Sequence, residues 1–383
     1  MECEREEKDE TDYHAETASV EEIMKQFQME TVTSDTIFKI LVQRSRVLET
    51  ALKGLDRKSI NFKSKLYIKF SGEMGEDAGG PRQEFFRLAM QNLKSSRYFE
   101  GSDCCKIFQH DISALEAGSY RLIGRLVGLS FAHNGPGLHF LSKDLYNLMV
   151  EKKMKIQEED NLLPEEKKNM IKKLREADDD AKKDAFTEMY GDQLLDLGIP
   201  NVFLMAQQNG LKLIELIVKH HIYYRISGEI SQFCDRMNDV NGAWSMVTTH
   251  ADLFQGMFCY KPEMLCGDDV INLFQVNDGL QGSNDRSLED TSIFGWELFL
   301  QAIEAGQTDV SFEDLLTFIT GASTLPPCVF HKLIDIDFYS CDGRLHSVST
   351  CALQLWLPRV TDPDLIGIMI TRACKESHGF LKV

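Results

Sequence analysis

One cysteine near the end of the chain lies among residue types that could support nucleophilic chemistry. Cys351 stands in the stretch HSVSTCALQLWLP, where Ser and Thr precede it and an apolar run follows it. A cysteine reacts as its thiolate, which needs access to solvent and nearby groups that stabilise the anion. The Thr350 hydroxyl can donate a hydrogen bond, and His346 and Arg344 can supply positive charge. Composition alone leaves two interpretations open, a reactive thiolate or an inert thiol.

The remaining cysteines and the histidines do not form a metal-binding pattern. Cys266, Cys328 and Cys374 lie next to apolar runs, so we expect core thiols there. No Cys-x-x-Cys pair and no Cys/His cluster has the spacing of a zinc site. His220 and His221 are adjacent and would not share one helix face, so we expect a surface pair. The sequence therefore predicts no metal site.

The common signatures of cofactor-dependent enzymes and of several hydrolases are also missing. The chain contains no Gly-x-x-x-x-Gly-Lys loop, no Gly-x-Ser-x-Gly elbow and no His-Glu-x-x-His helix. The stretch GEMGEDAGG is rich in Gly, but its three carboxylates would repel a phosphate group. We therefore expect no dissociable cofactor.

Composition narrows the class of protein further. The net charge of −18 over 383 residues argues against nucleic acid as the main partner, because phosphate binding needs a basic face. The opening MECEREEKDETDYHAE has no apolar core typical of a signal peptide, and no apolar run is long enough for a membrane span. Ten cysteines without a disulfide framework suit a reducing compartment, so we expect a cytoplasmic or nuclear protein with no membrane partner.

The first third of the chain predicts a tail followed by packed elements. Residues 1–34 are dominated by Glu, Asp and Thr, which predicts a disordered acidic tail. From about residue 35, the stretch TIFKILVQRSRVLETALKGL places apolar residues three and four apart, which is typical of a helix. A strand is predicted where apolar residues alternate, at Leu66, Ile68 and Phe70.

Further helices are predicted by proline and glycine positions. Pro81 begins a helix that contains RQEFFRLAM. In SYRLIGRLVGLSFAH, Gly124 and Gly128 share a face on which a neighbouring element can pack closely. Residues 151–184 are densely charged, and Pro164 precedes a helix with only a thin apolar stripe.

The pattern of apolar residues in the sequence changes after a polar segment. Residues 277–292 are rich in Gly, Ser, Asn and Asp, which predicts a flexible linker at a domain boundary. About ninety residues follow, in which helical patterns mix with short strand patterns such as KLIDIDFYS and ALQLWLP. The sequence therefore predicts an α+β protein with a large, mainly helical lobe and a small mixed lobe.

Three blocks of residues, in order, resemble the HECT-type ubiquitin ligase domain over roughly residues 36–383. The first is RSRVLETALKGL together with KLYIKFSGEMGEDAGGPRQEFF, and the second is YRLIGRLVGLSFAHN. The third comprises LLTFITGASTLP, STCALQLWLPRV and the terminal HGFLKV. About thirty residues separate Cys351 from the C-terminus, as in the family.

This resemblance implies a bilobal HECT-like fold with a flexible hinge. It divides the chain into an N-lobe at 35–280, a hinge at 281–291 and a C-lobe at 292–383, with a small subdomain at 155–205 that would bind a ubiquitin-conjugating enzyme. The implied partners are ubiquitin, a conjugating enzyme and a protein substrate.

The resemblance also assigns roles to the candidate site residues. Cys351 would accept ubiquitin as a thioester and pass it to a substrate lysine, with Thr350 as its hydrogen-bonding neighbour. Phe380 matches the terminal aromatic residue that helps to position the thioester. His346 would replace a cationic neighbour that the family motif has near the cysteine.

Departures from the family pattern keep a second function open. Around the cysteine the family usually has Pro, His, an aromatic residue and Asn, where this chain has His346, Ser349, Ala352 and Leu353. Residues 155–205 are charged and contain few apolar groove residues. The alternative is a degenerate HECT domain that binds ubiquitin, a conjugating enzyme or other proteins without catalysis. A cysteine hydrolase would need a partnering base, for which the sequence offers no local His/Asn pattern.

Overall fold

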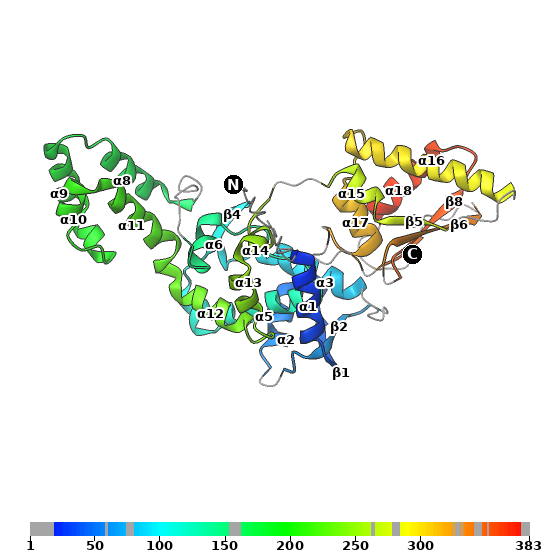
Figure 1. The fold of residues 1–383 in the computed structure, drawn as a ribbon, viewed down its shortest axis with the longest axis horizontal. Helices are drawn as coiled ribbons and strands as arrows, with labels where there is room; N and C mark the ends of the chain where they lie inside the picture. The colour runs from blue at the N-terminus through cyan, green and yellow to red at the C-terminus, as the bar shows by residue number, and fades with distance from the viewer. Residues whose placement is uncertain are drawn as a thin grey trace, which may run out of the picture.

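The computed structural model describes residues 19–57, 60–73, 80–152, 162–261, 265–277, 284–323, 325, 330, 332–340, 347–350 and 352–376. Two hydrophobic clusters organise this part of the chain, one built from Met24 to Cys259 and the other from Val270 to Ile370. Most elements are helices, and the strands form small sheets (Figure 1). The predicted α+β class is confirmed.

The first cluster contains nearly all of the N-terminal elements. In chain order these are α1 (Val20–Thr31), β1 (Ser34–Val42), η1 (Arg44–Arg46), α2 (Val47–Leu55), β2 (Ser64–Phe70), α3 (Gly80–Lys94), β3 (Phe99–Ser102), β4 (Cys105–Phe108), α4 (Ile112–Glu116), α5 (Ser119–Ala132), α6 (Lys143–Met149), α8 (Glu165–Arg175), α9 (Asp180–Asp196), α10 (Val202–Gln208), α11 (Gly210–Ile222), η2 (Tyr224–Ile226), α12 (Ser227–Met237), α13 (Ala243–Thr249) and α14 (Ala251–Phe258).

The second cluster contains the remaining elements. These are α15 (Gly267–Ile271), β5 (Phe274–Val276), α16 (Asn284–Glu304), α17 (Phe312–Thr320), β6 (Ile334–Ser340), β7 (Ser347–Ser349), β8 (Gln354–Arg359) and α18 (Asp364–Glu376).

The predicted acidic tail is too long. Helix α1 lies inside it and begins with a capping box, in which the Ser19 side chain and the Glu22 carboxylate satisfy each other's backbone N–H groups. Met24 is fully buried and Phe27 nearly so, so α1 is part of the first core. Two well-placed apolar side chains therefore anchor a helix that is otherwise polar, while residues 1–18 lie outside the described residues.

The helix predicted from residue 35 begins later than expected. Residues 34–42 form strand β1, which pairs in parallel with β2, and the helix α2 begins only at Val47. Ile40 and Val42 are buried on one face of β1, while Ile37 and Leu41 are exposed. Because β-branched residues at alternate positions suit a pleated sheet, strand pairing overrides the helical spacing here.

Helix α5 packs against α12 through its glycines, as predicted. A Cβ atom on Gly124 would lie 2.2 Å from the backbone carbonyl oxygen of Phe233, and one on Gly128 would lie 3.0 Å from that of Met237. No other residue type can come so close to a neighbouring backbone without moving it. The predicted strand β2 and the helix α3, with Pro81 in its first turn, are also confirmed.

Helices α8, α9 and α10 form a small unit that extends away from α2 and α5 (Figure 1). Met170, Ile171 and Leu174 supply the thin buried stripe of α8 that the sequence predicts. The predicted surface pair at His220 and His221 is wrong for His221, which is buried. Its Nε2 atom lies 3.2 Å from the carbonyl oxygen of Leu162, so it joins α11 to the segment that leads into α8.

The segment predicted as a hinge is largely helical. Residues 284–291 form the first turns of α16, whereas 281–283 lie outside the described residues. Glu289 and Ser292 are buried, because each side chain bonds to the end of β8. Polar residues that suggest a linker therefore make specific tertiary contacts.

The boundary between the two clusters also lies earlier than predicted. Leu265, Val270 and Leu273 belong to the second cluster, and the first ends at Cys259. Strand β5 explains this, because it pairs in parallel with β6 and extends the sheet to the order β5-β6-β8-β7. A strand of three residues leaves too short a pattern to recognise in the sequence.

Candidate active site

A short hairpin loop joins β7 to β8 at the place where the sequence predicts a nucleophile. The two strands are antiparallel, and Ser349 pairs with Gln354, which leaves residues 350–353 as the loop. Thr350 is half-buried at its start. Cys351, His346 and Phe380 lie outside the described residues, so their placement remains a prediction.

Backbone hydrogen bonds hold the loop on both sides of residue 351. The N–H of Ala352 donates to the carbonyl oxygen of Ser349 at 3.1 Å and to its hydroxyl oxygen at 3.3 Å. The carbonyl oxygen of Leu353 accepts a bond of 2.9 Å from the N–H of Asp335 on β6. Ser349 and Ala352 are therefore joined in a turn, and Leu353 is tied to the neighbouring strand.

The sheet beneath the loop has one apolar and one polar face. Ile334, Ile336, Leu355 and Leu357 are fully buried in the second core. On the other face Asp335, Asp337, Gln354 and Trp356 are half-buried, and α16, α17 and α18 gather around the strands (Figure 1). This alternation is typical of a sheet with one solvated face.

Carboxylates connect three strands on the polar face. Asp337 accepts hydrogen bonds from the amide of Gln354 and, at 3.0 Å, from that of Asn277. Asp335 accepts from Lys332 and from Gln275, each at 2.5 Å. The bond from Lys332 and that from Gln275 hold the pKa of the Asp335 carboxyl below its ordinary value. The network fixes Gln354, the first residue after the loop.

The far end of β8 is fixed by α16. Glu289 is 1% exposed, and one of its carboxylate oxygens accepts from Nε of Arg359 at 3.0 Å and from Nη2 at 2.6 Å. The hydroxyl of Ser292 donates to the carbonyl oxygen of Pro358 at 2.7 Å and accepts from the N–H of Val360 at 3.2 Å. Strand β8 is thus fixed at both ends.

The described cysteines differ in their surroundings. Burial raises the pKa of the Cys374 thiol to about 12, so this thiol is protonated and unreactive at neutral pH. Desolvation likewise raises the pKa of Cys234 well above its ordinary value. The core position predicted for Cys266 is wrong, because it is exposed at the start of α15 and its thiol donates to Asp269 at 3.1 Å. Cys328 lies outside the described residues.

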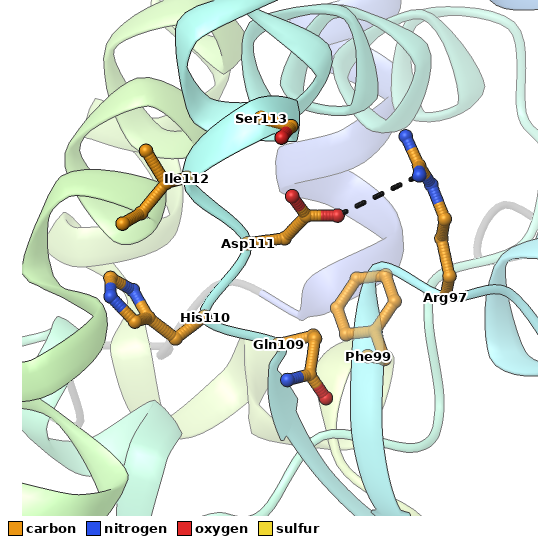
Figure 2. A pocket seen from close by; sticks show the side chains of 7 residues that line it. All are labelled: Arg97, Phe99, Gln109, His110, Asp111, Ile112 and Ser113. Atoms are coloured by element: carbon orange, nitrogen blue, oxygen red, sulfur yellow. Dashed lines mark ion pairs between the residues drawn. The ribbon is translucent and has the colours of Figure 1, made fainter.

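A hollow of about 550 Å³ lies on the first lobe, where no sequence motif predicts a site (Figure 2). Arg97 points toward Asp111, with 3.8 Å between Nη1 and Oδ2. Nδ1 of His110 lies 2.9 Å from a carboxylate oxygen of the buried Glu229. The other lining residues are Phe99, Gln109, Ile112 and Ser113. The hollow carries both signs of charge and contains no nucleophile paired with a base.

The small helical unit exposes more apolar surface than its sequence predicts. Phe203 and Leu204, adjacent on α10, are 55% and 50% exposed. Met189 and Leu195 on α9 and Leu211 on α11 are also exposed. The apolar residues are sparse in the sequence of this unit, but several of them face solvent. Exposed large apolar side chains at this density often mark a protein-binding surface.

The part of the chain that the structure describes holds no group of three His, Cys, Asp or Glu side chains arranged to bind a metal ion. None of its helices is long and apolar enough to cross a bilayer.

Comparison with known families identifies the class of protein. The model of the HECT-domain (ubiquitin-transferase) family matches residues 80–382, which include α3 to α18 and the hairpin loop. The chain belongs to this family.

Several proteins that are similar to this chain are named as E3 ubiquitin-protein ligases. The chain is 25% identical over 82% of its length to a G2/M phase-specific E3 ubiquitin-protein ligase of Gallus gallus, and 26% identical over 79% to that of Homo sapiens. It is 25% identical over 89% of its length to the E3 ubiquitin-protein ligase RSP5 of Saccharomyces cerevisiae. The chain spans about two fifths of these relatives, 42% of the first two and 43% of the third.

Proposed function

We propose that this chain is a ubiquitin-protein transferase in which Cys351 carries ubiquitin as a thioester. The Cys351 thiolate attacks the thioester carbonyl on a charged conjugating enzyme, and the thiolate of that enzyme leaves. A substrate lysine amine then attacks the new thioester, the Cys351 thiolate leaves, and the amine loses a proton as the isopeptide bond forms. Ubiquitin arrives activated, so the two exchanges need no cofactor.

The placement of Thr350 and its neighbours carries this proposal. They lie in a closed hairpin loop between two strands, within the region that the family model matches. A loop held on a rigid sheet is a common way to present a reacting group. In this proposal the Thr350 hydroxyl donates a hydrogen bond to the thiolate, and His346 and Phe380 complete the site.

The small helical unit supports a docking site for the conjugating enzyme. Phe203 and Leu204 are exposed on α10, in a unit whose helices α8 and α10 pack against α11. Replacing both with Ala should weaken binding of a conjugating enzyme at least tenfold, because buried aromatic and aliphatic anchors dominate such interfaces. Met29→Ala, at an exposed site on α1, is the control and should bind as the wild type does. Equal binding of all three proteins would remove this surface from the proposal.

A single-turnover loading assay separates transfer from binding alone. The protein is mixed with a panel of ubiquitin-charged conjugating enzymes and run on non-reducing gels beside Cys351→Ala. A ubiquitin adduct that thiol reagents remove, and that the variant lacks, supports transfer. If a folded wild-type protein binds ubiquitin or a conjugating enzyme but never loads, the degenerate binding module, which the unusual residues around Cys351 favour, replaces the proposal.

A further inference from the structure

Leu353 has a backbone conformation that its side chain does not favour. Its φ angle is +49°, in the left-handed region. In that region the Cβ atom of an L-residue comes close to the following carbonyl oxygen, which Gly avoids and Asn tolerates. Among the described non-glycine residues with positive φ, Leu353 alone is aliphatic; the others are Asn134, His139, Glu151, Asn201 and Asn241.

Burial compensates for this strain. The Leu353 side chain is 3% exposed and belongs to the second hydrophobic cluster. Moving this side chain into water would lose apolar burial of a size that matches or exceeds the strain of one left-handed residue. The side chain therefore holds the backbone in a conformation that an exposed leucine would leave.

That conformation decides how the loop rejoins the sheet. The turn closed by the N–H of Ala352 on Ser349 ends immediately before Leu353, and Gln354 begins β8 immediately after it. Hairpin loops of this kind often use a left-handed residue at the step between turn and strand. In this arrangement the carbonyl oxygen of Leu353 accepts a hydrogen bond of 2.9 Å from the N–H of Asp335.

We propose that Leu353 is a positioning residue, whose buried side chain fixes the loop that carries Cys351. Its part in catalysis rests on the proposed function, because it would serve to hold Cys351 ready for transthiolation. Its part in fixing the loop does not depend on transfer. The two can be tested separately.

Two substitutions of similar volume distinguish positioning from simple filling of the core. Leu353→Met keeps an apolar side chain that is not branched at Cβ, so it tolerates the backbone as leucine does. Leu353→Ile fills the core equally but is β-branched, which strongly disfavours positive φ. A residue that only fills space would tolerate both changes about equally. A residue that holds the loop would tolerate Met and not Ile.

The first readout is the reactivity of the Cys351 thiol. Limited alkylation with iodoacetamide is followed peptide by peptide by mass spectrometry, with the exposed Cys266 as internal reference. We expect Leu353→Ile to raise the ratio of Cys351 to Cys266 alkylation at least fivefold, because a loosened loop admits a small reagent. Leu353→Met should stay within twofold of wild type. Equal ratios in both variants would overturn the proposal.

The second readout is ubiquitin loading, in which a loosened loop has the opposite effect. Leu353→Ile should load at least tenfold more slowly than wild type, while Leu353→Met loads within twofold. If wild type itself does not load, the transfer proposal fails while alkylation still decides the role of Leu353. If Leu353→Ile does not fold, Leu353→Ala replaces it, since Ala keeps the Cβ atom that strains the backbone and loses the buried side chain that compensates for the strain.

Discussion

The buried His221 predicts a measurable dependence of stability on pH. Its Nε2 lies 3.2 Å from the carbonyl oxygen of Leu162, so Nε2 carries the proton and Nδ1 accepts from Nζ of Lys167 at 3.3 Å. Desolvation, reinforced by the charges of Arg225 and Lys167, lowers the pKa of His221 from 6.5 to about 3. The folded protein therefore holds this ring neutral in a range where the unfolded chain protonates it.

The sign and size of the effect follow from linkage. Between pH 6.5 and 3 this residue binds more protons in the unfolded chain than in the folded protein. Its contribution to the free energy of unfolding is therefore full at neutral pH and is lost as the pH falls. From pH 7 to pH 5 the loss amounts to about 2 kcal/mol for this histidine. His133, whose pKa is also lowered to about 3, adds to the fall in the wild type.

The assay is urea unfolding of wild type, His221→Gln and Leu213→Ala at pH 7 and pH 5. Leu213→Ala, at a fully buried position of the same helix, should lower the free energy of unfolding by about 3 kcal/mol at both pH values. His221→Gln should be about 1–2 kcal/mol less stable than wild type at pH 7, through its lost hydrogen bonds, and about equal to it at pH 5. A deficit of the same size at both values would refute the reasoning.

Three further predictions concern packing, and each is checked by urea unfolding at pH 7. Gly124→Ala should lower the free energy of unfolding by about 2–3 kcal/mol, because the new Cβ would lie 2.2 Å from a carbonyl oxygen of α12; a loss under about 0.5 kcal/mol would contradict the close packing. Arg359→Met should lower the free energy of unfolding by about 3 kcal/mol, because it leaves the buried Glu289 on α16 without its guanidinium partner. Arg286→Met, which breaks a pair with the exposed Asp290 on α16, should change it by less than about 0.5 kcal/mol. Met24→Ala should lower stability by about 3 kcal/mol if α1 is part of the core, and by almost nothing if residues 19–31 behave as a tail.

The spacing of apolar and small residues predicted those elements in which one face is clearly apolar or small in the sequence itself. Helix α5 was recognisable because its small residues share one face, and β2 because its apolar residues alternate. Strand β1 was mistaken for a helix because only a partner distant in sequence, β2, decides between the two structures.

Tertiary contacts account for the other differences between prediction and structure. The N-terminal part of α16 looks like a linker because its buried residues include Glu289 and Ser292, which are polar and find their partners at the end of β8. Strand β5, at residues 274–276, is too short to give a period, although it moves the start of the second cluster to about residue 265.

The position of the candidate loop was predictable from the sequence and its backbone conformation was not. The residue types around Cys351 indicated a loop, and the described residues on both sides of it lie in a hairpin loop, while the chemistry of Cys351 stays a prediction. The left-handed conformation at Leu353 could not be predicted, because leucine is among the residues that least suggest it. The exposed apolar surface of the small helical unit was underestimated because a count of apolar residues does not show that Phe203 and Leu204 face solvent.

Replacement of the proposed nucleophile by a hydroxyl tests the central claim most directly. Cys351→Ser is incubated with a ubiquitin-charged conjugating enzyme that loads the wild type, and the adducts are treated with a thiol reagent or with mild alkali. If residue 351 is the acceptor, the wild-type adduct is removed by thiol. The variant should instead form a smaller amount of an ester that resists thiol and is cleaved by alkali. A thiol-sensitive adduct on Cys351→Ser, formed as fast as on the wild type, would place the thioester on another cysteine and contradict the account.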